Sequence, residues 1–278
     1  MKETRAEQLA VDKLRPFDGH PFKVVDNEEM DQLVWSILTQ GLLTPLVVRP
    51  LDNGEYEVIS GHRRLHACKK AGIETVPALI YAIDRDAAAI ALVDSNLQRE
   101  HILPSEKAFA YKLKLEAMNH QGRTSGQVGQ KWTRDEIAEG ESGRQVQRYI
   151  RLTNLIPGIL QKVDEGRIAL TPAVELSYLT DAEQEDLLET MESEDCTPSL
   201  SQAIQMKALS QSGQLDMDTI FHIMTQPKAN QQEKISFKVS ELRDFFPRHY
   251  TAAQMMQEIK MALKERQQRL ARQRDHSR

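Results

Sequence analysis

The chain is poor in cysteine, because Cys68 and Cys196 are the only two among its 278 residues. Two cysteines cannot form a disulfide framework, which argues against a small secreted fold held together by disulfides. No apolar run approaches the roughly 20 residues that a membrane-spanning helix needs. The N-terminal stretch MKETRAEQLAVDKLRP also lacks the apolar core of a secretory signal. We therefore expect a cytoplasmic protein with no membrane partner.

A strong excess of one charge is absent too, since 36 Lys and Arg against 41 Asp and Glu give a net charge of −5. This total argues against a uniformly basic nucleic-acid coat. The charges are nevertheless segregated: residues 181–230 carry ten acids and two lysines, whereas residues 231–278 carry eleven bases and six acids. Because local patches set the attraction to a polyanion, the total does not exclude DNA as a partner.

The first hundred residues alternate between helical and strand patterns. The expected elements are a helix over 26–43, strands over 46–49, 55–60 and 76–83, a helix that begins at 62, and a helix over 85–97. Asp26 and Glu29 form a candidate capping box, and Gly41 ends the first helix. Asp52-Asn53-Gly54 is a strong hairpin signal between the first two strands. These patterns predict a small α+β domain at residues 8–100.

The segment EVISGHRRLHACKKAG, residues 57–72, joins a β-branched strand, a glycine and a helix that opens with two arginines. The first turn of a helix has unpaired backbone N–H groups and the positive end of the helix dipole. Arg63 and Arg64 add permanent donors there, and Gly61 lets a ligand approach the backbone closely. The segment therefore predicts an anion site that suits a phosphate chain. Surface ion pairs of both arginines are the alternative.

From Pro104 onward the pattern is helical, which predicts a DNA-binding domain at residues 101–226 and a strand–helix association unit with a basic tail at 227–278. Within the predicted DNA-binding domain, residues 133–155 have the dimensions of a helix-turn-helix, with helices over 134–139 and 144–154. One arc of the second helix carries Arg144, Arg148 and Arg151. Arginine and glutamine are the side chains best suited to base edges in the major groove, so this arc is the candidate DNA-reading face. The alternative is an ordinary solvated basic helix. The candidate DNA contacts are Thr133, Ser142, Gly143, Arg144, Gln145, Gln147 and Arg148.

Four segments in this order resemble the ParB/Noc-like partition proteins, and the resemblance runs from about Leu14 to Leu188. The first three are similar to that family's GLLQPIxVR, GERRxRAxxxAG and ENLQREDLxPxEEAxAY patterns, and the fourth follows the helix-turn-helix. The segments are GLLTPLVVRP (41–50), SGHRRLHACKKAG (60–72), SNLQREHILPSEKAFAY (95–111) and RLTNLIPGILQKVDEGRIALTPAVELSYL (151–179).

The resemblance implies an N-terminal ParB/sulfiredoxin-like α+β domain followed by an all-α helix-turn-helix domain. It further implies a homodimer that binds CTP with Mg²⁺, loads onto a centromere-like site on double-stranded DNA, and works with a ParA-type ATPase in a bacterial nucleoid. The nucleotide residues carried over by position are Thr44, Pro45, Gly61, His62, Arg63, Arg64, Ser95, Asn96 and Arg99. In sulfiredoxin a catalytic cysteine precedes the His-Arg pair, and this chain has Gly61 there.

Two departures from the family's pattern bear on chemistry, because His62 and Ser95 occupy positions where the family has acids. Mg²⁺ normally takes oxygen ligands from carboxylates, so we expect nucleotide binding with little or no hydrolysis. His62 and His66 lack a third ligand, and neither a protein-only metal site nor a catalytic residue is predicted. Two other interpretations stay open: a nuclease or phosphotransfer enzyme that uses the same anion site, and a helix-turn-helix transcriptional regulator that has lost the nucleotide.

Overall fold

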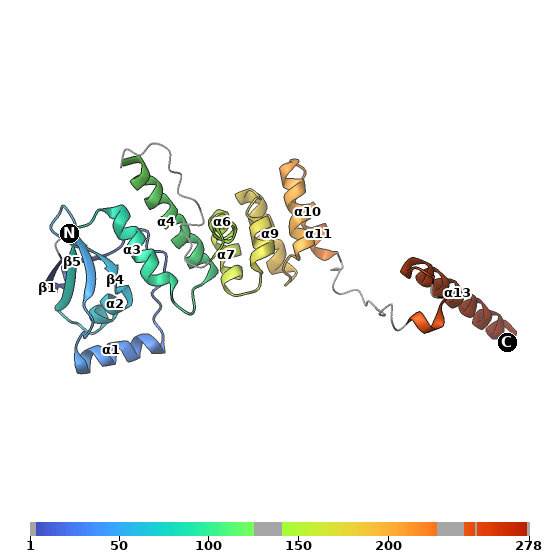
Figure 1. Cartoon of the computed structure of the whole chain (residues 1–278), viewed down its shortest axis with the longest axis horizontal. Helices are drawn as coiled ribbons and strands as arrows, with labels where there is room; N and C mark the ends of the chain where they lie inside the picture. The colour runs from blue at the N-terminus through green and yellow to red at the C-terminus, as the bar shows by residue number, and fades with distance from the viewer. Residues whose placement is uncertain (1–3, 125–140, 227–241, 248, 277–278) are drawn as a thin grey trace. The chain divides into compact units, whose positions relative to one another are not determined.

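The computed structural model describes residues 4–124, 141–226, 242–247 and 249–276, and Figure 1 shows the order of their elements. The chain divides into two compact units, Met1–Gln226 and Pro227–Arg278. Among the described residues, no helix has both the length and the apolar character needed to cross a membrane.

A mixed five-stranded sheet forms the first part of the larger unit, with the strand order β1-β5-β3-β4-β2. Its strands are β1 (Thr4–Ala10), β2 (Leu14–Pro16), β3 (Leu46–Pro50), β4 (Tyr56–Ser60) and β5 (Thr75–Tyr81). The predicted hairpin is confirmed, since β3 and β4 are antiparallel. β3 pairs in parallel with β5, and β2 in parallel with β4. Both strands that the sequence did not predict, β1 and β2, lie at the edges of the sheet, where the apolar patterning of a strand is weakest.

Both faces of the sheet are covered, and neighbouring residues of β4 show this directly. Val58 packs with α1 (Glu28–Gln40) and α2 (His62–Lys70) in one buried cluster. Ile59 packs on the opposite face with α3 (Arg85–Leu97). Successive side chains of a strand point to opposite faces, so a strand buried on both sides reads as a continuous apolar run. The Gly61 connection that follows β4 is therefore held in place from both faces.

The start of α1 differs from the predicted capping box. Asn27 is the N-cap, and its side chain accepts a hydrogen bond from the Met30 backbone at 3.1 Å. Asp26 instead accepts hydrogen bonds from His66 and Lys70, each at 3.0 Å, and so joins the start of α1 to α2. Gly41 ends α1 with a positive φ of 73°, as predicted.

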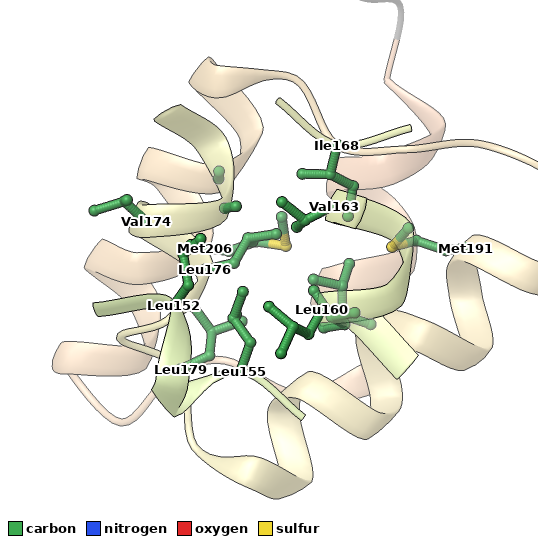
Figure 2. Packing of buried hydrophobic residues seen from close by; sticks show 14 of the residues in the cluster. Leu152, Leu155, Leu160, Val163, Ile168, Val174, Leu176, Leu179, Met191 and Met206 are labelled. Carbon is green, nitrogen blue, oxygen red and sulfur yellow. The ribbon is translucent and has the colours of Figure 1, made fainter. Parts of the chain in front are cut away.

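The helical region follows as α4 (Pro104–Thr124), α6 (Gly143–Arg151), α7 (Pro157–Asp164), α8 (Leu170–Leu176), α9 (Asp181–Ser193), α10 (Leu200–Gln211) and α11 (Met217–Thr225). One core of buried side chains, several of which Figure 2 labels, unites α7 to α11; it includes Leu152, Ile159, Leu176 and Met206. α4 begins at Pro104, where the helical pattern of the sequence is expected to begin, and continues to Thr124. The first helix of the predicted helix-turn-helix, 134–139, and Thr133 lie outside the described residues.

α4 contributes buried side chains both to the sheet domain and to the helical core. Ala110 and Ala117 are buried beside α3, whereas Ala108 belongs to the core of the helical region. At the start of α4, Ser105 donates from its backbone N and its Oγ to Asp164 of α7, at 2.9 and 2.6 Å. α4 is therefore the element through which the two halves of the larger unit pack together.

In the smaller unit, the described residues contain a 3₁₀ turn (Arg243–Phe245) and the long helix α13 (Ala252–His276). Met255 is buried, whereas Met256, Met261 and Leu263 are exposed. The strand expected in the association unit lies outside the described residues.

Candidate functional site

A pocket of about 540 Å³ lies at the N-terminus of α2. Its walls come from α1, from the connection between β4 and α2, and from the end of α3. The lining residues are Glu29, Gln32, Leu33, Ser60, Gly61, His62, Arg63, Arg64, Ser95, Asn96 and Arg99. All the predicted nucleotide residues except Thr44 and Pro45 are among them, although they come from segments more than thirty residues apart in the sequence.

Gly61 allows the close approach that an anion at this helix needs. Its φ of 104° and ψ of 25° lie in the left-handed region that favours glycine. A Cβ there would lie 2.6 Å from Leu46 Cδ2, a buried core atom. No side chain among the described residues caps α2, so its first backbone N–H groups are available to a ligand. The strand–glycine–helix prediction is confirmed at this point.

Arg64 joins the pocket to the two predicted residues that do not line it. Its Nη1 donates to the carbonyl oxygens of Thr44 and Pro45, the second at 2.8 Å. Burial lowers the pKa of Arg64, although an arginine remains charged. The guanidinium therefore fixes the connection before β3 against α2.

Arg63 and Arg99 are the two other guanidinium groups of the pocket. Arg63 Nη2 lies 3.1 Å from Glu29 Oε2 on α1. The Arg99 guanidinium lies 5.5 Å from the centre of the Phe22 ring, within cation–π range. Burial lowers the pKa of Arg99, and the charge of Arg63 adds to this shift, so the two cations lie close enough to interact. These two like charges in a pocket lined by one carboxylate, Glu29, favour an anionic ligand.

His62 faces the protein main chain. Its Nε2 accepts a hydrogen bond from the Phe17 backbone N at 3.3 Å, and a backbone hydrogen bond to Val58 also engages the ring. The ring is 3.7 Å, centre to centre, from that of His20. Burial lowers the pKa of His62 to about 3, with further lowering by His20 and Arg99, so the ring is neutral. A neutral imidazole has one nitrogen lone pair, and the Phe17 N–H occupies it. His62 is thus unsuited to act as a base or a metal ligand.

Ser95 and Asn96 are held by the end of their own helix. Ser95 Oγ donates to the Leu92 carbonyl at 2.9 Å, and Asn96 Nδ2 donates to the same oxygen at 2.7 Å. Asn96 Nδ2 also donates to Ser95 Oγ at 3.2 Å. These contacts fix the orientation of the Asn96 amide at the pocket wall, and Ser95 brings no negative charge.

The α1 wall of the pocket consists of Glu29, Gln32 and Leu33, none of which is among the predicted nucleotide residues. Glu29 and Gln32 are three residues apart and lie on the same side of the predicted helix, which was a usable signal. Their proximity to Arg63 depends on how α1 packs on α2, and no local pattern encodes that packing.

The candidate DNA-binding helix α6 packs by one face and exposes another. Ser142 is its N-cap and accepts from the Gln145 backbone N at 3.3 Å. Val146 is fully buried with Tyr111 and Met118 of α4, and Gly143 is buried too. Arg144 is exposed, and Gln147 is half-buried. The N-terminal half of α6 therefore presents polar side chains to solvent.

The three arginines predicted to share the DNA-facing arc of α6 differ in their contacts. Arg148 donates from Nη2 to Thr171 Oγ1 at 2.6 Å and from Nη1 to Gln145 Oε1 at 3.1 Å. Arg151 was placed wrongly: its guanidinium lies 3.8 Å from the centre of the Tyr178 ring, and Nη2 donates to the Ser177 carbonyl at 3.1 Å. α8 and the turn after it therefore cover the last turn of α6, which the helical projection alone cannot show.

A buried carboxylate orients the start of α6. Glu141 forms an ion pair with Lys107 of α4, and a hydrogen bond from Tyr111 reaches the same carboxylate. Burial and the charge of Glu141 together raise the pKa of Tyr111, so the phenol stays protonated and donates. Lys107 Nζ also lies 5.0 Å from the centre of the Tyr149 ring. α4 thus holds both the first turn and the middle of α6.

Comparison with known proteins gives one family description and several relatives. Residues 1–97 match the ParB N-terminal domain. The probable chromosome-partitioning protein ParB of Vibrio cholerae is 30% identical over 244 residues, which are 87% of this chain and 79% of that protein. Stage 0 sporulation protein J of Bacillus subtilis is 32% identical over 172 residues, and the chain covers only 56% of its length.

The solved structures that resemble the chain include C-terminally truncated ParB from Caulobacter crescentus. Its complex with the centromeric parS site is 23% identical, covers 74% of this chain and 99% of that chain, and has a TM-score of 0.43. Its complex with CTP-gamma-S is 24% identical, covers 68% and 99%, and has a TM-score of 0.32.

Proposed function

The chain belongs to the ParB family, and from that premise we propose that it is a dimeric partition protein that binds a centromere-like DNA site and uses CTP as an effector. Nucleotide and specific DNA together would control its loading or spreading on double-stranded DNA. A second copy of the chain and a ParA-type ATPase are its expected protein partners. The family assignment rests on sequence similarity, and the functional proposal rests on the two sites described above.

The pocket at the start of α2 is the observation that carries the nucleotide part of the proposal. Gly61 gives access to backbone N–H groups, and Arg63 and Arg99 supply two positive charges at the same place. Helix N-termini with converging guanidinium groups suit a phosphate chain. Arg64 acts differently in this proposal, because it holds the connection that contains Thr44 and Pro45, two residues that the resemblance carries over as nucleotide-binding.

The polar N-terminal half of α6 supports the DNA part of the proposal. Arg144, Gln145 and Gln147 are suited to base edges, and the N-cap region at Ser142 is suited to a backbone phosphate. Arg148 donates to Thr171 across to α8, so it would contact DNA only by leaving that partner or by bridging from it.

Self-association has support in the smaller unit. α13 exposes Met256, Met261 and Leu263, apolar side chains that a second copy of the helix would bury. Two-fold DNA sites pair naturally with dimeric readers. We therefore place the permanent dimer contact on this helix.

Slow or absent nucleotide hydrolysis follows from the pocket chemistry. The lone pair of His62 is occupied by the Phe17 backbone, and Ser95 has no charge, so neither residue can activate water. The same observation weakens the alternative of an enzyme with His62 as its acid or base. The regulator alternative requires that the pocket bind no nucleotide.

Nucleotide affinity and DNA affinity measured on the same variants test the proposal. Titration of the full chain with CTP, ATP, GTP and UTP, with and without cognate DNA, is expected to show preference for CTP. Arg63→Ala should abolish CTP binding and leave first recognition of the DNA site intact. Arg15→Ala is the matched control, because Arg15 pairs with Glu55 away from the pocket and its loss should change neither activity.

Three results would contradict parts of this proposal. Equal loss of DNA recognition and CTP binding in Arg63→Ala would mean that the pocket is only structural. Binding of DNA with no nucleotide response at all would favour the transcriptional regulator. Rapid phosphate release that needs both Mg²⁺ and cognate DNA would refute slow hydrolysis.

A further inference from the structure

Glu29 is the one carboxylate among the described residues that line the pocket. It belongs to α1, a helix that contributes nothing to the four segments on which the family resemblance rests. The rest of the lining consists of cationic, neutral polar and apolar groups. A carboxylate at the rim of a phosphate site is unfavourable for an anion unless a cation comes with it.

The position of Glu29 is set by the packing of α1 on α2, since Met30 and Leu65 belong to one buried cluster, and polar contacts on both sides of Glu29 add to it. Asn27 caps α1 two residues earlier, and Asp26 binds His66 and Lys70 of α2. Lys70 also pairs with Asp31 at 3.0 Å. The first turn of α1 is thus joined to α2, and the side chain of Glu29 extends from that turn to Arg63 of α2.

The partner of Glu29 is a group that the phosphates would take. Arg63 Nη2 lies 3.1 Å from Glu29 Oε2, and the Glu29 side chain is 69% exposed. Exposed ion pairs of this kind contribute about 0–1 kcal/mol, so a phosphate can displace the carboxylate from the guanidinium at little cost. Displacement leaves the Glu29 carboxylate beside the phosphate chain without its counter-charge.

We propose that Glu29 is the protein carboxylate that binds a divalent cation in this pocket, together with the oxygens of a bound triphosphate. The inference rests on the proposed nucleotide function and deepens it. Mg²⁺ is usually held by one or two carboxylates plus substrate phosphates, and it keeps several waters. His62 and Ser95 bring no carboxylate to the pocket from α2 and α3, so the negative charge of the protein at this site comes from Glu29 of α1.

The cation and the nucleotide bind only together under this proposal. The described residues contain no group of three or more His, Cys, Asp and Glu side chains that could hold a metal ion without further ligands. Without a cation, Glu29 retains Arg63 and repels the phosphates. With a cation, the same carboxylate attracts the complex, so its contribution to nucleotide affinity changes sign with the metal.

Isothermal titration of the full chain with CTP, in excess Mg²⁺ and in EDTA, tests the sign change. For the unaltered chain we expect Mg²⁺ to raise CTP affinity by about tenfold or more. For Glu29→Gln we expect tighter binding than the unaltered chain in EDTA and a metal effect reduced to about threefold or less. Glu28→Gln is the matched control, since it makes the same charge change one position earlier on α1, outside the pocket.

The outcomes separate this inference from the function on which it rests. The same ratio of affinities in Mg²⁺ and EDTA for Glu29→Gln and the unaltered chain would overturn the assignment of Glu29. Equal tightening of Glu29→Gln under both conditions would also overturn it, because Glu29 would then be only a repulsive charge. If the unaltered chain binds no CTP under either condition, the nucleotide proposal itself fails. Identical behaviour of the Glu28 and Glu29 variants would assign the effect to net charge.

Discussion

Replacement of Gly61 by alanine is expected to destabilise the sheet domain far more than the same change at Gly72. Both glycines have positive φ, 104° at Gly61 and 67° at Gly72. They flank the same helix, α2, so the two substitutions act on one element. Their surroundings differ, because an added Cβ at Gly61 would lie 2.6 Å from Leu46 Cδ2 and one at Gly72 would meet nothing within 4 Å.

The magnitude of the destabilisation follows from three contributions: backbone strain, the entropy of the unfolded chain, and overpacking against Leu46. Left-handed backbone costs an alanine about 1–2 kcal/mol at either position, and the smaller entropy of the unfolded chain returns about 0.4–1 kcal/mol. The contact with Leu46, a fully buried residue, adds overpacking that typically costs about 1–3 kcal/mol. We expect the free energy of unfolding of the sheet domain to fall by roughly 1 kcal/mol in Gly72→Ala and by roughly 2–4 kcal/mol in Gly61→Ala.

Amide hydrogen exchange followed by mass spectrometry measures the loss locally, which avoids assuming that a chain with two compact units unfolds in one step. Peptides that cover β3, β4 and α2 give the free energy of opening of the sheet domain. Peptides from α9 to α11 serve as an internal reference that neither substitution touches. If Gly61→Ala lowers the opening free energy of β4 no more than Gly72→Ala does, the argument from the Leu46 contact is refuted.

Two further predictions follow from contacts that the sequence did not reveal. Arg151→Ala should lower the free energy of unfolding of the helical region by about 1–2 kcal/mol, because it removes the Tyr178 and Ser177 contacts. Arg144→Ala should leave stability unchanged and reduce the salt dependence of DNA binding. Thermal melts and DNA titrations at several salt concentrations distinguish the two variants, and the reverse pattern would contradict the assignment. Burial lowers the pKa of His62 to about 3 and that of His20 to about 4, below the unfolded value of about 6.5, so the unfolded chain binds more protons as the pH falls. The free energy of unfolding of the sheet domain should therefore fall by on the order of 1–2 kcal/mol per histidine between pH 6.5 and pH 5. The double variant His20→Gln, His62→Gln should show a flatter pH profile in the same exchange measurement, and an equal fall in both proteins would speak against neutral, buried rings.

The pocket gives α1 and α2 unequal roles in the proposed nucleotide response. α2 presents backbone N–H groups and guanidinium groups that attract phosphate, while α1 presents the carboxylate that opposes it until a cation arrives. The ion pairs of Asp26 and Asp31 with Lys70 tie the two helices together. Buried side chains also pack α1 on α2, so separation of Glu29 from Arg63 by a ligand would leave the main contact between the two helices in place.

Local patterns in the sequence were sufficient to predict most of the elements of the sheet domain. The β4–Gly61–α2 turn and the β3–β4 hairpin are found where periodicity and turn residues placed them. These features depend on residues within a few positions of one another, and so the chain encodes them locally. The edge strands β1 and β2 were not predicted, because their pairing with β5 and β4 stabilises them more than their own pattern does.

The sequence by itself thus determined the family, the strand–glycine–helix turn at the start of α2 and the order of helices. Only the tertiary structure decided which side chains line the pocket at that turn. Glu29 reaches Arg63 across 34 residues, Phe17 occupies the lone pair of His62 across 45, and Tyr178 covers Arg151. Each contact exists because two separately encoded elements pack at one orientation, and that orientation is set by the buried clusters between them. A helical projection shows which residues share a face, and packing decides what that face contacts.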